Sequence, residues 1–214
     1  IQHFLGIDWE ATWRDLALHY SSITWAFVLD IVVDYGVYLV SAFGLFILFA
    51  AGQYSLGHAG LVGIAAYSTA VMVVKFGVPF WLSLPLSGLA GLLAGIIYYY
   101  LLGARLSGFY LAIATFAVSE ALVTLWLSTD YLGGALGMHG IPLASQWHTV
   151  LIVVAIVIFG LWRLQKSRFW LSFLAIRESP IVAGAMGVNV AGTRMLAWGI
   201  GGFITGIGGN LWAH

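Results

Sequence analysis

Residues 161–189, LWRLQKSRFWLSFLAIRESPIVAGAMGVN, form a polar interruption in a chain that is otherwise long and apolar. Half of the chain's 8 basic residues lie in this stretch, with Glu178 as its only acid. They are Arg163, Lys166, Arg168 and Arg177. Because Lys and Arg accumulate in the cytoplasmic loops of membrane proteins, we expect this segment to face the cytoplasm.

The second half of the stretch predicts a short helix with a defined start. Ser179 is a good N-cap, and Pro180 suits the first helical position because its missing N–H would have no partner there. Gly187 or Asn189 would close the helix, since both residue types tolerate the left-handed conformation. We therefore expect a short, capped helix held between two membrane spans on the inner face.

The composition fixes the class of protein. Hydrophobic residues make up 62% of the chain and charged residues 7%, with a mean hydropathy of +1.00. Soluble domains carry about 25% charged residues, so the chain is predicted to be an integral membrane protein. A net charge of +0 gives no indication of a nucleic-acid partner, and the absence of Cys excludes disulfides and thiolate metal sites.

Hydrophobic runs predict an all-α polytopic bundle of about six spans, with residues 1–24 as an N-terminal segment outside it. That segment is either an amphipathic helix in the membrane interface or a loosely ordered leader. The predicted spans are residues 31–51, 60–74, 81–102, 109–128, 147–162 and 195–213. Since the chain starts at Ile1 and ends in an apolar run at His214, we expect both ends to be truncated.

Alternation of these spans gives an orientation that the charges support. With residues 161–189 inside, Arg105 and Arg194 are also inside, which makes six basic residues inside in all. Arg14 and Lys75 are outside. This bias follows the positive-inside rule and places the N-terminal segment on the outer, periplasmic side.

Residues 51–67, AGQYSLGHAGLVGIAAY, break the apolar pattern between the first two spans. The break contains four glycines, a polar cluster at residues 53–55, and His58. Irregular backbone within a membrane is tolerated only where protein or a water-filled cavity satisfies it, so we expect this segment to dip into the bundle. No second His lies at metal-ligand spacing from His58, so no metal site is predicted.

Acidic residues inside spans are costly and are candidates for function. Asp30 and Asp34 lie at the start of the first span, where the outer headgroup level is the simpler interpretation. Glu120 lies near the middle of the fourth span and is either a pathway residue or a neutral carboxyl packed between helices. A polar stripe on the same helix favours the bundle interior for this face; it consists of Thr115, Ser119 and Thr124.

Many of the 27 glycines lie inside apolar runs, which predicts close helix–helix contacts. The candidates for packing are Gly91 and Gly95 in the third span and Gly202 and Gly206 in the last. The chain lacks a GxxxxGK[ST] phosphate loop, an HExxH motif and a GxSxG motif. We therefore expect a protein that is not an enzyme, and transport is the remaining large class.

Three stretches together resemble one known family, the permeases of branched-chain amino-acid ABC importers. The run AGQYSLGHAGLVGIAAY is similar to the family's GQxSLGHAxFxGIGAY signature. GFYLAIATFAVSE, with the LGGALGMHGIP that follows, resembles its fourth span and outer loop. AIRESPIVAGAMGVN and GGFITGIGGNLWAH resemble its AIRExxxAAxxxGI and AGxLYAH segments. The family usually has Pro, Gly and more Arg where residues 168–174 read RFWLSFL.

The resemblance implies an assembly in the bacterial inner membrane. Two permease subunits, identical or different, would pair above two cytoplasmic ATPase subunits, and a periplasmic binding protein would deliver substrate. Residues 25–214 would be the permease domain, incomplete at its C-terminus, with 163–189 as the cytoplasmic coupling segment. ATP and Mg²⁺ would bind the ATPases, with no cofactor on this chain. The residues expected to couple to the ATPase are Arg177, Glu178, Ser179, Pro180, Ala183 and Gly187.

The resemblance also implies a small-molecule substrate, and the wider family moves leucine-type amino acids, urea, short amides and aromatic acids. A pathway lined by small and apolar residues suits a branched-chain or related hydrophobic amino acid better than a sugar. The polar candidates along it are Ser55, His58, Tyr67, Thr115 and Glu120.

Other classes of function stay open on the sequence. An ion-coupled secondary transporter would use Glu120 with Asp30 and Asp34 as a proton relay. A structural subunit that anchors a larger assembly is a further alternative, and a membrane enzyme is more remote because no paired catalytic groups are present.

Overall fold

The computed structural model describes residues 9–214, with side chains at Arg14, Trp25 and from residue 27 onward. This described part is helical and contains no strand. Its α-helices are α1 (Trp9–Ala50), α2 (His58–Phe76), α3 (Phe80–Tyr98), α4 (Gly108–Ser128), α5 (Trp147–Gln165), α6 (Arg168–Glu178), α7 (Pro180–Ala185) and α8 (Val190–Ala213). A π-helical turn, η1 (Tyr99–Gly103), extends α3, and two short 3₁₀ turns, η2 (Asp130–Leu132) and η3 (Gly134–Leu136), follow α4.

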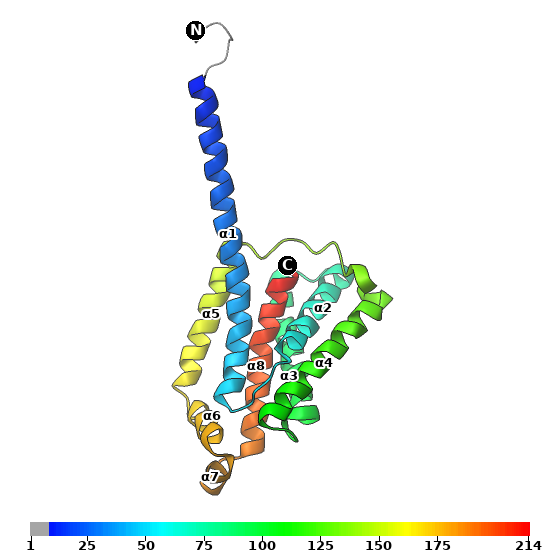
Figure 1. Cartoon of the computed structure of the whole chain (residues 1–214), viewed down its shortest axis with the longest axis vertical. Coiled ribbons are helices and arrows are strands. Elements are labelled where there is room, and N and C mark those ends of the chain that lie inside the picture. Colours follow the sequence, from blue (N-terminus) through cyan, green and yellow to red (C-terminus); the bar gives the residue numbers. More distant parts are fainter. Residues whose placement is uncertain (1–8) are drawn as a thin grey trace.

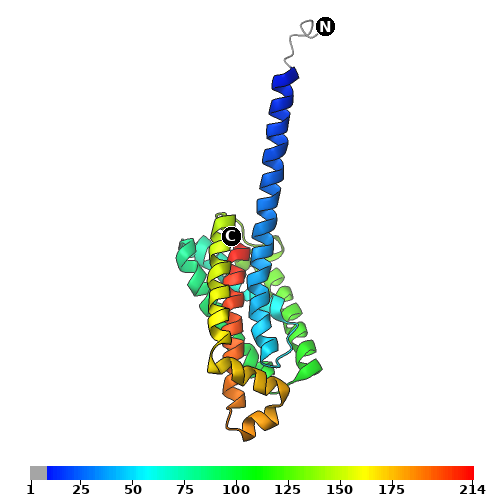
Figure 2. The ribbon, with the colours of Figure 1, turned by 90° about the vertical axis from the view of Figure 1, so that its left-hand side faces the viewer.

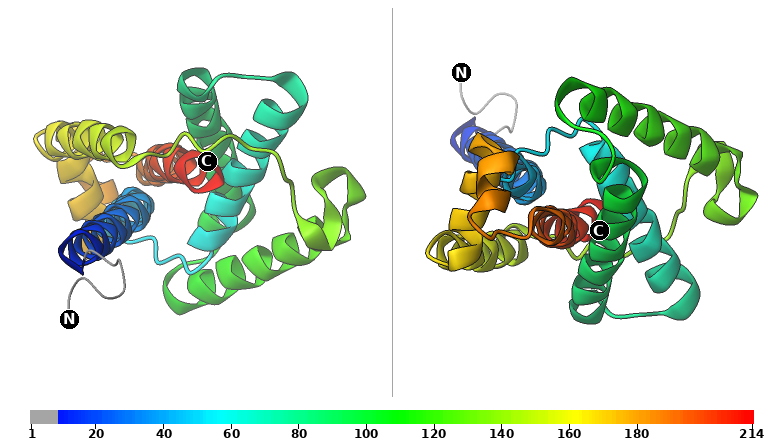
Figure 3. Two further views of the ribbon diagram at one scale, coloured as in Figure 1. Left: turned by 90° about the horizontal axis from the view of Figure 1, so that it is seen from above. Right: turned by 90° about the horizontal axis from the view of Figure 1, so that it is seen from below.

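The structure is a polytopic membrane bundle built around α8. Five helices in the described residues are long and apolar enough to span a membrane: the residue 27–50 part of α1, α2, α3 with η1, α4, and α5. The sixth predicted span, α8, lies between α1 and α5 on one side and α2, α3 and α4 on the other (Figure 3). Because neighbouring helices surround α8, it needs fewer large apolar side chains than a helix that faces lipid.

Glycine makes the close contact between α3 and α8. A Cβ at Gly91 would collide with the carbonyl oxygen of Gly202, and one at Gly95 with the carbonyl oxygen of Trp198. A Cβ at Gly206 would in turn meet the carbonyl oxygen of Ser87. The four glycines named from the sequence therefore lie where two helix backbones touch, as close small-residue packing requires.

The two ends of the bundle agree with the predicted topology. The helices α6 and α7 lie at one end, together with the turn between η1 and α4 that holds Arg105 (Figure 1). The start of α1, the loop after α4 and the C-terminal end of α8 lie at the opposite end (Figure 1). Segments expected inside thus share one end of the molecule.

The first helix is longer than the predicted span. One continuous helix, α1, runs from Trp9 to Ala50, and its N-terminal half projects beyond the bundle (Figures 1 and 2). From Trp9 onward, the N-terminal segment therefore continues the first span and is not a separate element. Residues 1–8 lie outside the described residues.

The outer loop contains the short turns η2 and η3, and the cytoplasmic segment contains α6; none of these was predicted from the sequence. At the outer end, the Nζ of Lys75 donates to the Tyr131 carbonyl oxygen (3.0 Å) and lies 2.9 Å from the centre of the Tyr131 ring. At the inner end, α6 is an additional helix before α7, and its start is capped by Ser167, whose hydroxyl accepts from the Trp170 N–H (3.4 Å).

Candidate functional site

The segment between α1 and α2, residues 51–57, enters the bundle and is held there by α4. The hydroxyl of Thr115 accepts a hydrogen bond from the Leu56 N–H (3.1 Å). The hydroxyl of Ser119 accepts from the Gly60 N–H (2.9 Å) and donates to the Gly57 carbonyl oxygen (2.9 Å). Two side chains one helical turn apart thus satisfy the irregular backbone, which inside a membrane has no water to do so.

Glycine is required where this segment meets α4. A Cβ at Gly57 would collide with the carbonyl oxygen of Thr115 and lie 2.8 Å from the Thr115 Cβ. A Cβ at Gly60 would lie 2.5 Å from the Ser119 hydroxyl oxygen and 2.7 Å from that of Tyr98. Any larger residue would therefore move the segment away from α4.

The segment also contacts α8 and α6. The buried side chain of Gln53 accepts a hydrogen bond from the indole N–H of Trp198 (3.2 Å). The Nε2 of His58 lies 3.5 Å from the hydroxyl oxygen of Thr205 in α8. At Gly52, whose φ is +69°, a Cβ would lie 3.1 Å from the Cα of Arg177 in α6. The segment is thus in direct contact with the central helix and with the cytoplasmic end.

Replacing Ser119 with alanine should destabilise the protein, because two buried hydrogen bonds between α4 and the entering segment are lost, and the Gly60 N–H and the Gly57 carbonyl keep only their bond to each other (3.1 Å). Each lost bond contributes about 0.5–1.5 kcal/mol, so we expect a drop of a few degrees in the melting temperature. The control is Ser128→Ala, since the exposed Ser128 hydroxyl donates only to Leu125 of its own helix (3.1 Å). Equal melting temperatures for the two purified variants would show that Ser119 does not hold the segment.

The polar stripe expected on α4 is divided between two faces. Thr115 and Ser119 are buried against residues 51–60, whereas Glu120 and Thr124 are exposed on the outer face. The expectation that the whole stripe faces the interior was wrong for Thr124, because it follows Ser119 by five residues and so points about 140° away from it. Glu120 follows Ser119 by one residue and points about 100° away from it. Its carboxylate is therefore not packed between the helices of this chain.

The predicted pathway residues do not all meet in one place. Ser55, His58 and Thr115 lie together at the entering segment, where the buried Ser55 hydroxyl accepts from the Gly57 N–H (3.2 Å). Tyr67 lies further along α2 and stacks on Trp126, with ring centroids 5.0 Å apart.

At the cytoplasmic end, α7 has the predicted cap at each terminus. The Ser179 hydroxyl accepts from the Val182 N–H (3.3 Å), and Pro180 is the first helical residue. At the other end, Gly187 has a φ of +88° and its N–H donates to the Gly184 carbonyl oxygen (3.0 Å), while the next N–H reaches the Ala183 carbonyl oxygen (3.0 Å). This paired pattern is a Schellman motif, which ends the helix sharply.

Asn189, the other residue predicted to end α7, instead caps the start of α8. Its Oδ1 accepts a hydrogen bond from the Gly192 N–H (3.0 Å). Only Val188 therefore separates the end of the α7 turn from the cap of α8. The connection between α7 and the central helix is therefore short.

The outward side of α7 is apolar. Ile181 is 86% exposed, Met186 is 81% exposed, and Val182 is exposed between them, while Ala183 is buried against the protein. Just before the helix, Arg177 and Glu178 form an exposed ion pair (3.3 Å). An apolar surface of this kind, with charges beside it, is typical of a site that binds another protein.

The carboxylates of the first span lie at the opposite end. Asp30 and Asp34 line a cavity of about 930 Å³ at the outer end of α1, α5 and α8, together with the ring of His214. The described residues contain no group of three or more His, Cys, Asp or Glu side chains that could hold a metal ion.

Ser119 was named from the sequence as part of the polar stripe, and it lies in the interior beside Thr115 because it follows that residue by four positions on the same helix face. Other residues of the site were missed by the sequence interpretation. The partners on α8, Trp198 and Thr205, lie more than 140 positions from the residues they contact. No pattern in a single sequence joins them.

Comparison with known proteins gives one family and three informative relatives. The family model described as "Branched-chain amino acid transport system / permease component" matches residues 27–213. The chain is 27% identical to the high-affinity branched-chain amino acid transport system permease protein LivM of Salmonella typhimurium, over 92% of this chain and 56% of that protein. It is 27% identical to the probable branched-chain amino acid transport permease protein LivH of Methanocaldococcus jannaschii, over 76% of this chain and 55% of that protein. It is 26% identical to the guanosine ABC transporter permease protein NupQ of Bacillus subtilis, over 76% of this chain and 59% of that protein.

The chain spans about half the length of these curated relatives. No solved structure gives a significant match. The family model covers most of the chain, including α1 from Phe27, the entering segment, α7 and nearly all of α8. The chain therefore belongs to the permease component family of branched-chain amino acid transport systems.

Proposed function

We propose that the chain is a permease subunit of an ATP-driven importer in the bacterial inner membrane. The observation that carries this proposal is α7, a short helix capped at both ends on which Ile181 and Met186 are exposed. A rigid helix with an exposed apolar face is suited to bind a groove in a second protein and to be moved by it. ATP and Mg²⁺ would bind that ATPase and not this chain.

The contacts of α7 suggest how movement would pass into the membrane. A force on α7 acts on α8 through the one-residue connection at Val188 and on α6 through Ser179. From α6, it reaches residues 51–57 through the close approach of Gly52 and Arg177. Because α8 and the entering segment are packed against α3 and α4, the helices would move as rigid bodies, as alternating access requires.

For the substrate, we propose a branched-chain or related hydrophobic amino acid. Two of the relatives named above are branched-chain amino acid permeases, which supports this substrate class. The permease relative for guanosine makes a nucleoside the competing candidate. The complete importer would also need a second permease subunit, two ATPase subunits and a periplasmic binding protein.

A proton-coupled transporter has less support. Its relay would join Asp30 and Asp34 to Glu120, but the two aspartates line the outer cavity beside α5 and α8, whereas Glu120 is exposed on the outer face of α4. No hydrogen bond among the described residues connects these groups. The three carboxylates therefore do not form a continuous path within this chain.

Purification of the full-length subunit, with its bound polypeptides identified by mass, tests the proposal. We expect a nucleotide-binding ATPase and a second permease subunit to be recovered with it. A homo-oligomer without an ATPase, together with uptake that collapses with the proton gradient and persists without ATP, would contradict the proposal.

Glu120→Gln should lower uptake by about tenfold or more. An exposed carboxylate in the middle of a span is costly unless it faces a partner or water, so we propose that this face of α4 lines the pathway or meets the second permease subunit. A lost hydrogen bond to a charged group corresponds to about 1.5–3 kcal/mol. Normal uptake by reconstituted Glu120→Gln protein would exclude both roles.

A further inference from the structure

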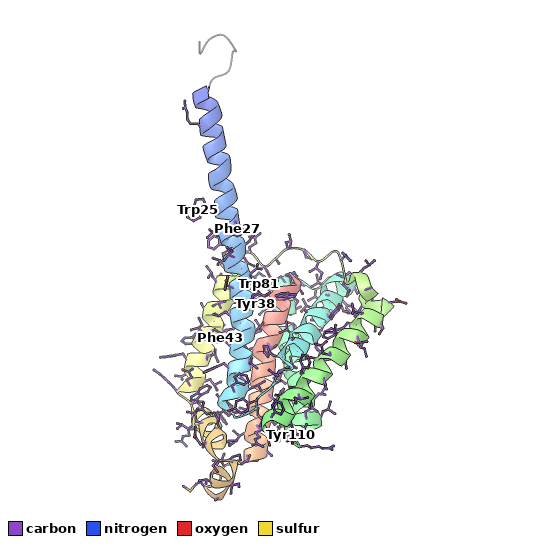
Figure 4. The ribbon with its side chains drawn as sticks, viewed as in Figure 1. Trp25, Phe27, Tyr38, Phe43, Trp81 and Tyr110 are labelled. Carbon is purple, nitrogen blue, oxygen red and sulfur yellow. The ribbon has the colours of Figure 1, made fainter. Side chains whose placement is uncertain are left out.

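A second feature of the bundle lies on its lipid-facing side and has no part in the proposed transport mechanism. A groove of about 510 Å³ runs between α1 and α5 in their cytoplasmic halves. Its wall on α1 consists of Leu39, Ala42, Phe43 and Phe46, and its wall on α5 consists of Ile158, Leu161, Trp162 and Gln165. Phe43 lies between these two helices (Figure 4). All but one of the lining side chains are apolar.

Lys166 lies at the cytoplasmic end of this groove, and two further cations, Arg163 and Arg168, are near it in the sequence. The Nζ of Lys166 lies 3.8 Å from the centre of the Trp162 ring, which itself lines the groove. Arg163 is exposed and follows Trp162 by one residue, a step of about 100° around α5. Arg168 begins α6, which is joined to the α1 wall by the contact of Phe46 with Trp170 (ring centroids 5.5 Å apart). We call Arg163, Lys166 and Arg168 the basic rim.

Within the described part of the chain, no ion pair neutralises the basic rim. The sequence has no acid between Asp130 and Glu178. Among the side chains that the structure describes, Glu178 pairs with Arg177 and not with the rim. Three uncompensated positive charges at the headgroup level therefore attract an anion.

We propose that the groove and the basic rim together bind an anionic phospholipid. An acyl chain would lie in the apolar groove and the phosphate would contact the rim, as in basic pockets between transmembrane helices. From residue 39 to residue 46, α1 rises about 10 Å, so the groove accommodates most of one acyl chain within its leaflet. A second copy of this chain fits less well, because two basic rims brought together would repel each other.

The groove and the basic rim each explain a feature of the chain that the proposed transport function does not explain. The rim accounts for cations placed beside the membrane and away from α7. The groove accounts for Trp162 at its cytoplasmic end, because Trp favours the interface between headgroups and acyl chains. An acyl chain and a phosphate are needed together to cover both.

Retention of lipid by the purified full-length subunit tests this site. The subunit is reconstituted in nanodiscs with equal amounts of phosphatidylglycerol and phosphatidylcholine, released into detergent, and examined by native mass spectrometry. We expect phosphatidylglycerol to remain bound to the unmodified protein. In the triple variant Arg163→Gln, Lys166→Gln, Arg168→Gln, retention should fall about tenfold or more, because the variant removes the cations that would contact the phosphate.

Two further variants separate the groove from general surface charge. Ala42→Trp fills the groove and leaves every charge in place, so it should also reduce retention. Arg105→Gln removes an exposed cation from a turn away from the groove and should have no effect. If Ala42→Trp retains lipid normally, or if Arg105→Gln loses it as the triple variant does, the groove does not bind the lipid.

The rim would serve the ATPase instead if the triple variant lost ATPase co-purification while its phosphatidylglycerol retention stayed normal. That result would overturn the lipid site and leave the proposed transport function intact. Loss of lipid with ATPase binding unchanged would support the lipid site independently of that function.

Discussion

Replacing Ile181 with aspartate should abolish recovery of the ATPase with the permease, and uptake should be lost with it. Ile181 is 86% exposed on α7, so in the proposed complex its side chain is buried by the partner. The substitution removes about 2 kcal/mol of apolar burial and adds an unpaired charge that costs several kcal/mol more to bury. Together these correspond to at least about a hundredfold loss of affinity.

The permease itself should fold normally in this variant. Residue 181 lies in the first turn of α7, where a negative charge interacts favourably with the helix dipole. The matched control is Leu136→Asp, because Leu136 is 84% exposed in the outer loop. Co-purification of the ATPase is measured for both proteins. Equal recovery of the ATPase from the two variants would exclude α7 as the binding surface.

Replacing Gly206 with leucine should produce the largest loss of stability in the bundle. A Cβ at this position would collide with the carbonyl oxygen of Ser87 and lie 2.9 Å from the Cα of Gly88. Because the obstacle is backbone, it cannot be relieved by a change of rotamer, and α3 and α8 must separate. We expect a cost of about 3 kcal/mol, at the upper end for overpacking, and a melting temperature about 10 °C lower.

The control for this change is Gly160→Leu in α5. No atom lies within 4 Å of a Cβ built at Gly160, so the same substitution meets open space there. Thermal unfolding of the two detergent-purified variants is followed by size-exclusion chromatography. Unfolding of both variants at the same temperature would mean that the glycine contact between α3 and α8 does not set the stability.

The fold class followed from composition and hydrophobic runs, because a bilayer permits few structures. With 7% charged residues and long apolar segments, only a helix bundle can satisfy the backbone of this chain. The caps of α7 were equally local: Ser179, Pro180 and Gly187 each act on neighbouring residues. The extra helix α6 was not predicted, because residues 161–189 were interpreted as a polar segment and the cap at Ser167 was not recognised.

The contacts that form the site could not be predicted from the sequence. The pairing of residues 51–60 with Thr115 and Ser119 depends on how α2 and α4 pack, and a single sequence does not contain that information. Glu120 illustrates the limit: one step of about 100° along α4 separates it from the buried Ser119. Assigning a residue to a helix is local, but assigning that helix's face requires its neighbours.

The many glycines of α8 have a consequence for biosynthesis. In the described part of the chain, α8 is a long helix of the bundle that does not meet the hydropathy expected of a span. A nascent helix so rich in glycine gains little from entering lipid alone. We therefore expect its insertion to depend on α1, α2 and α3 being already in the membrane. Assembly of this protein would then couple insertion to folding, and a defect in an early helix would leave the last one outside the bilayer.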